Sequence, residues 1–159
     1  ETSTNLLRCL LAESKLAPRF VRPSTSSITD RRARLLIGDQ AIRFRQRHTD
    51  EFRFLDLGEQ WKKLVAFPFV YAFWLIRPEV VDAERIANRL RMLRDQNLAR
   101  IDNLIAEEKD FDRDFCHRYY RENLRFSLGN REREGLRIFQ ELCEKHDLIQ
   151  KREVKFELV

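Results

Sequence analysis

The sequence predicts an α/β protein in which strands alternate with helices in the first half and helices alone fill the second. Short apolar runs alternate with helical patterns as far as Ile76, and from Asp82 onward the apolar residues recur every three or four positions. The 159 residues include only 4 Gly and 4 Pro, so turns should be few and elements long. The change of pattern divides the chain into residues 1–77, an α/β lobe, and residues 78–159, a helical segment.

The first half is expected to hold three helices and four strands. A helix is predicted over residues 3–14, because its leucines follow helical spacing, and Thr2, Ser3 or Thr4 is a suitable N-cap. Asp56 is a suitable cap for another helix. The further predicted helices cover residues 40–48 and 57–65, and the predicted strands cover residues 19–22, 33–37, 52–55 and 67–76, with a Ser/Thr-rich loop at 24–29.

The second half is expected to hold three amphipathic helices. The first begins at Asp82, an N-cap, and keeps an apolar stripe to about Glu108. The second spans residues 112–124, and the third follows Asn130 with Phe139 and Cys143 on its apolar face. Residues 154–158 alternate between apolar and charged, as an edge strand does.

The net charge of +5 raises the possibility of a nucleic-acid partner. Arginines are concentrated at positions 31–34 and 43–47, which would suit phosphate contacts. However, 26 acidic residues dilute this field and no recognition motif is present. We therefore favour a solvated helix face and attraction for a small anion, and predict no nucleic-acid partner.

The remaining composition points to a chain without a membrane span, metal or cofactor. No apolar run reaches the roughly 18 residues of a spanning helix, so no membrane partner is expected. Cys9, Cys116 and Cys143 are widely separated and form no CxxC, which favours neither disulfides nor zinc and predicts a reducing, cytoplasmic location. His48 and the other two histidines share no metal or triad spacing and are expected at helix ends or on the surface.

Several strings of sequence carry a resemblance to a known family. They are LLIGDQAI at 35–42, LDLGEQW at 55–61, PFVYAFW at 68–74, ARID at 99–102 and YRENLRFSLG at 120–129, followed by Glu134-Gly135-Leu136 and Phe139. Together, in order and spacing, they resemble the chorismate dehydratases of menaquinone biosynthesis over nearly the whole chain. The chain departs from that family at Val65-Ala66, where Thr-Gly is usual. This puts the backbone geometry of the loop in question, because Gly adopts angles that Ala does not.

The resemblance implies a fold and a reaction. The fold is the two-lobed, type II periplasmic-binding-protein-like α/β fold, with this chain as the second lobe plus C-terminal helices that return to an N-terminal lobe missing here. The reaction is that of a lyase, converting the dicarboxylate chorismate into 3-[(1-carboxyvinyl)oxy]benzoate in the futalosine route. Because half of the cleft is missing, we expect the isolated chain to be inactive. The alternative is a solute- or effector-binding module of the same fold without catalysis.

Two turns are the first candidates for substrate binding. The segment Thr2, Ser3, Thr4 and Asn5 lies at a predicted helix start, where free N–H groups and hydroxyls favour a carboxylate, although an ordinary N-cap explains it equally well. Gly38 and Asp39 follow a predicted strand, where α/β clefts bind ligands, although a simple role for Asp39 as the cap of the next helix also explains the pair. The enzyme interpretation requires that the two turns face a shared gap.

Aromatic residues supply the remaining candidates. A flat ring could be lined by the aromatic side chains of Trp61, Phe67, Phe69, Phe73 and Trp74. Such spacing is more typical of a core, however, and Trp74 is expected there. We keep Pro68 and Phe69 as candidate cleft contacts. No residue is identified as the group that removes the substrate proton.

Overall fold

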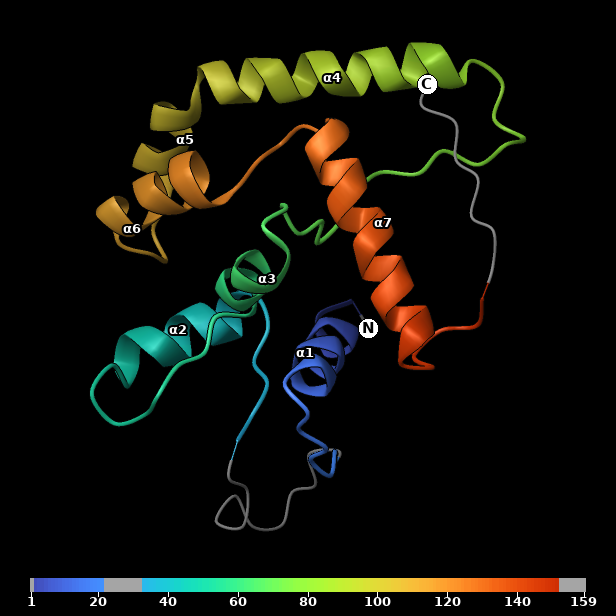
Figure 1. The fold of residues 1–159 in the computed structure, drawn as a ribbon. Coiled ribbons are helices and arrows are strands. Elements are labelled where there is room, and N and C mark those ends of the chain that lie inside the picture. Colours follow the sequence, from blue (N-terminus) through green and yellow to red (C-terminus); the bar gives the residue numbers. More distant parts are fainter. Residues whose placement is uncertain (1, 22–32, 152–159) are drawn as a thin grey trace. The chain divides into compact units, whose positions relative to one another are not determined.

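The computed structural model describes residues 2–21 and 33–151, and helices are the only regular elements within those ranges (Figure 1). They fall into two compact units, the first holding α1, α2, α3 and α7 and the second holding α4, α5, α6 and η2. The predicted division at residue 77 stays a prediction. The elements are α1 (Thr2–Glu13), α2 (Asp39–Arg47), α3 (Leu57–Val65), α4 (Ala83–Ala99), α5 (Ile101–Glu107), α6 (Arg113–Arg118), the π-helical η2 (Tyr119–Asn123) and α7 (Asn130–Lys145).

The core of the first unit is built where α1 packs against α3 and α7. Leu6 and Trp61 are fully buried there and Leu10 nearly so. Partly buried apolar residues of α3, α7 and the chain after α3 pack around these three: Leu57, Val65, Phe69, Ile138, Phe139 and Leu142. The apolar spacing that predicted the first helix therefore marks its buried face, and the core-facing prediction for the last helix is confirmed as well.

Both ends of α3 have clear local causes. The Asp56 carboxylate accepts a hydrogen bond from the Glu59 amide at 3.0 Å, which confirms its predicted role as N-cap. At the other end Ala66 adopts the left-handed conformation, with φ 62° and ψ 11°. The guanidinium of Arg131 donates to the Ala66 carbonyl at 3.1 Å and lies over the Phe67 ring, so α7 holds this strained turn in place.

The second unit contains the first two of the three helices predicted from residue 82 onward, with two interruptions. Asp82 occupies the N-cap position of α4, and its carboxylate pairs with Arg85 instead of capping the helix. The predicted long helix breaks at Arg100, which separates α4 from α5. Asp112 caps α6 through the Phe115 amide, and the helix then widens into η2 before ending at Asn123.

The predicted strands at 19–21, 33–37, 52–55 and 67–76 are wrong, since these segments carry no strand. Short runs of apolar residues supply strand propensity, but a strand forms only against a neighbouring strand, and none lies within the described ranges. Trp74 was expected in the core but is 78% exposed, and Leu75 is 72% exposed. Of the predicted α/β class, the structure therefore confirms the helices and not the sheet. Residues 22, 24–29 and 154–158 lie outside the described residues.

Candidate functional site

The candidate residues Thr2, Ser3, Thr4 and Asn5 form the first turn of α1. Because α1 begins at Thr2, these hydroxyls lie inside the helix, and the prediction that Thr2, Ser3 or Thr4 is the N-cap is wrong. The first amides of a helix lack intrahelical acceptors, and no acidic side chain lies in this turn to occupy them. The positive end of the α1 dipole therefore lies at this turn.

Gly38 and Asp39 start α2. Gly38 has φ 63° and ψ −146°, a conformation nearly restricted to Gly, and its carbonyl accepts from the Ala41 amide at 2.9 Å. Gly38 thus takes the N-cap position and Asp39 is the first helical residue, so the alternative in which Asp39 caps the helix is wrong. The Asp39 carboxylate is exposed and favourably placed near the positive end of α2.

Pro68 and Phe69 lie against α3 and α7. The Phe69 ring makes edge contacts with Trp61, Phe139 and Tyr71, with centroids 5.3, 4.9 and 4.8 Å away. The Pro68 carbonyl approaches α7 so closely that only Gly fits at position 135. These two residues are therefore positioned by the core, and any ligand contact at Phe69 would use the remaining exposed part of its ring.

The structure brings some of the candidate groups together and leaves others apart. Leu6, one residue after Asn5, shares the core with Phe69, so α1 and Phe69 belong to one packed cluster. On α2, Phe44 instead packs with Phe52 and Phe54. Gly38 and Asp39 are thus anchored by a separate aromatic group.

An ion cluster that the sequence did not reveal joins the ends of α1 and α7. The Glu13 carboxylate accepts from Lys145 Nζ at 2.6 Å and lies 2.7 Å from His146 Nε2. Hydrogen bonds from Lys145 and then His146 hold the pKa of Glu13 below its ordinary value. These positions are 132 and 133 residues apart in sequence, so no local pattern indicates the contact.

A pair of thiols was also missed. Cys9 and Cys143 are both buried, and their Sγ atoms lie 3.7 Å apart, although the spacing of the cysteines in the sequence suggested isolated thiols. The hydrogen bond between them raises the pKa of Cys9 and lowers that of Cys143. Cys143 was correctly placed on the apolar face of its helix, and that was the available signal.

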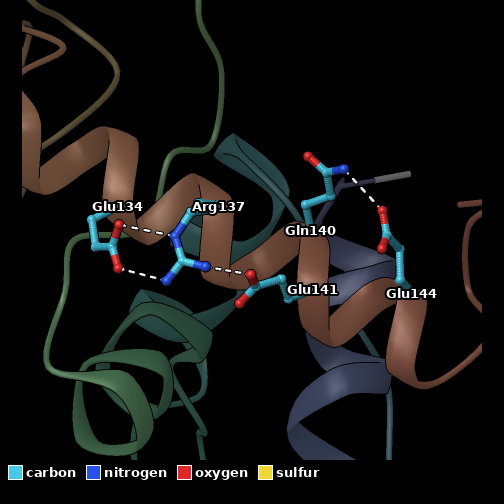
Figure 2. Close-up of polar contacts among 5 residues, drawn as sticks. All are labelled: Glu134, Arg137, Gln140, Glu141 and Glu144. Atoms are coloured by element: carbon cyan, nitrogen blue, oxygen red, sulfur yellow. Dashed lines mark hydrogen bonds and ion pairs between the residues drawn. The ribbon is translucent and has the colours of Figure 1, made fainter. Parts of the chain in front are cut away.

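The outward face of α7 is covered by side-chain interactions within the helix (Figure 2). Arg137 bonds both carboxylate oxygens of Glu134, at 2.7 and 3.0 Å, and also pairs with Glu141. Gln140 donates to Glu144 at 2.9 Å. Such contacts three and four residues apart stabilise the helix and leave its apolar face free for the core.

Other kinds of site find little support in the described ranges. No group of three or more His, Cys, Asp and Glu residues could hold a metal ion there, and none of the described helices is long and apolar enough to cross a membrane. His48 and His146 end α2 and α7, as predicted for helix ends. A surface depression at the end of α7 contains none of the candidate residues and is lined by Glu141, Glu144, Lys145 and residues 147–151.

Comparison with known proteins agrees with the sequence strings. A family model described as menaquinone biosynthesis matches residues 1–145, nearly the whole chain. This defines a protein of menaquinone biosynthesis. The chain belongs to the chorismate dehydratase family of that route, as the resemblance indicated. No curated protein and no solved structure shows significant similarity.

Proposed function

We propose that this chain is part of a lyase that removes water from chorismate to give 3-[(1-carboxyvinyl)oxy]benzoate. The observation that carries the proposal is the family match over residues 1–145. The proposal includes the two-lobed fold implied by the resemblance, with this chain forming one wall of the cleft. The exposed apolar residues Trp74 and Leu75 support it, because apolar side chains of this size are normally covered by another part of the protein. It also includes a cytoplasmic location, supported by three free cysteines.

The reaction requires little covalent chemistry from the protein. A proton leaves the ring carbon that bears the enolpyruvyl ether, and the hydroxyl on the neighbouring carbon departs, so that water is lost and the ring becomes aromatic. Aromatisation supplies the driving force. The protein has to hold a dianion away from bulk water and to position the group that accepts the proton.

The candidate residues divide this work by their chemistry. The first turn of α1 offers its amides and the hydroxyls of Ser3 and Thr4 to one substrate carboxylate. Asp39 is proposed to orient the substrate hydroxyl, since it is exposed beside the open space at Gly38. Phe69 and Pro68 are proposed to contact the flat ring from the core side.

A non-catalytic binding module of the same fold is the second candidate. The absence of an identified proton acceptor among the candidate residues favours it, because a binder needs only the anion contacts. The two candidates differ in one observable, which is whether bound chorismate is converted or released unchanged.

The test is conversion of chorismate, followed by chromatographic separation of the benzoate product. The protein encoded by the complete gene is compared with the 159-residue chain under the same conditions. We expect product from the complete protein and none from the isolated chain. Tight chorismate binding by the complete protein without product would replace the lyase with the binding module. Absence of both binding and product would overturn the proposed function altogether.

A further inference from the structure

Helices α1 and α7 meet at two levels. Cys9 lies opposite Cys143, and one turn further along, Glu13 contacts Lys145 and His146. Residues four apart share a helix face, so Cys9 and Glu13 present one side of α1 to α7. The ion cluster therefore fixes the register in which the two sulfurs approach.

The separation of the sulfurs is small enough for a covalent bond after side-chain rotation. The Sγ atoms are 3.7 Å apart, and a disulfide needs about 2.05 Å. Both thiols are free, and Cys116, the third cysteine, belongs to the other unit. Neither the proposed reaction nor the candidate substrate contacts use this pair.

We propose that Cys9 and Cys143 are a redox pair that closes to a reversible disulfide in the presence of a small-molecule disulfide, locking α1 onto α7. Cys143 attacks one sulfur of the small disulfide and releases one thiolate. Cys9 then loses its proton and attacks Cys143 Sγ in the mixed disulfide, releasing the second thiolate. Two protein thiols are thus oxidised and one small disulfide is reduced to two thiols, with both protons passing to the released thiolates.

Two features of the pair favour this order and make it slow. The hydrogen bond with Cys9 lowers the pKa of the Cys143 thiol, which makes Cys143 the better first nucleophile. Both side chains are buried, with exposures of 0% for Cys9 and 1% for Cys143, so the reagent enters only when α1 opens locally. Once closed, the bond spans 134 residues of chain and holds the helix that begins with Thr2.

The experiment equilibrates the folded chain with glutathione mixtures of increasing oxidised fraction. Thiols are then blocked with a maleimide in denaturant, and the protein is weighed intact and mapped by peptides. We expect two of the three thiols to disappear together, a mass loss of two hydrogen atoms and a peptide linking Cys9 to Cys143. The midpoint of thermal unfolding should rise by roughly 10 °C on oxidation and return on reduction.

Matched variants identify the pair. Cys116→Ser should retain the cross-link and the thermal shift, and Cys143→Ser should lose both. The proposal is overturned by three reactive thiols across the whole series, by a cross-link through Cys116, by a covalent dimer, or by a mixed disulfide that never resolves. Because intact mass and peptide mapping are read on the unmutated chain, a variant that fails to fold leaves the test decisive.

Discussion

The Cα atom of Gly135 faces the carbonyl oxygen of Pro68 so closely that a β-carbon at position 135 would lie 2.0 Å from that oxygen. The contact joins α7 to the chain that follows α3, at the edge of the aromatic cluster around Phe69. Backbone cannot turn aside as a side chain can, so the close approach depends on the missing side chain.

Replacing Gly135 with Ala is expected to destabilise the first unit by about 2 kcal/mol. Overpacking against backbone costs up to ~3 kcal/mol, and the better helix propensity of Ala returns about 1 kcal/mol. Urea unfolding of Gly135→Ala measures the loss. Gly129→Ala is the matched control, because its β-carbon would meet a side-chain carboxylate, that of Glu132, and no backbone atom. Equal stability of the two variants would contradict the close approach.

Replacing Ala66 with Gly is expected to stabilise the chain by up to about 1 kcal/mol. Left-handed backbone costs a non-glycine residue roughly 1–2 kcal/mol, and the extra freedom of Gly when unfolded offsets part of the gain. Ala12→Gly, inside α1, is the control and should lower stability by roughly 0.5–1 kcal/mol. Chemical denaturation of both variants decides the point, and a loss of stability in Ala66→Gly would refute the assigned conformation.

The Glu13 cluster predicts a pH dependence of stability. The folded pKa of Glu13 lies below its ordinary value near 4.5, so the ionised carboxylate stabilises the fold fully above that pH. This contribution is lost as the pH falls through the folded pKa. Glu13→Gln should therefore lower stability at neutral pH, by less than about 1 kcal/mol, and match the unmutated chain in acid.

Urea unfolding between neutral pH and acid measures this convergence. Asp50→Asn, which removes an exposed carboxylate after α2, serves as the control. Its stability difference from the unmutated chain should not shrink in the same way as the pH falls. A difference between Glu13→Gln and the unmutated chain that stays constant with pH would show that the contact does not depend on the charge of Glu13.

Removing one hydroxyl from the first turn of α1 tests the proposed carboxylate contact. Thr4→Val in the protein from the complete gene should raise KM for chorismate by about 5–10-fold with little change in kcat, since a uniform binding contact is lost. Thr49→Val is the matched control, because its hydroxyl only donates to the Arg45 carbonyl on an exposed helix end. The same KM in both variants would remove Thr4 from the site.

The sequence predicted those features that depend on neighbouring residues. Asp56 precedes a helix and caps it, and Trp61 lies on the apolar face of that helix and is buried. Strand propensity in residues 67–76 was equally local, but a strand needs a partner elsewhere in the chain, and propensity does not supply one. The contacts of Cys9 with Cys143 and of Glu13 with Lys145 are non-local in the same sense, so spacing could not reveal them.

For the candidate site, local signals identified the residue types but not their arrangement. The Thr/Ser turn at residues 2–4 was correctly expected at a helix start. The cap assignment was wrong because the helix already begins at Thr2. Gly38 has a positive φ, which Gly adopts readily, yet the sequence favoured its neighbour Asp39 as the helix cap. Phe69 is held by α3 and α7 together, which only the packed structure defines.

The indole nitrogen of Trp61 is buried without a hydrogen-bond acceptor among the described residues. No such acceptor therefore stabilises the excited state of the indole, and Trp61 should fluoresce at short wavelength. Because the ring is buried, iodide in solution should not quench this emission. Trp74, largely in solvent, should emit at long wavelength and be quenched readily. The two tryptophans thus give the chain a built-in pair of optical reporters, one for the packing of α1, α3 and α7 and one for whatever comes to cover Trp74.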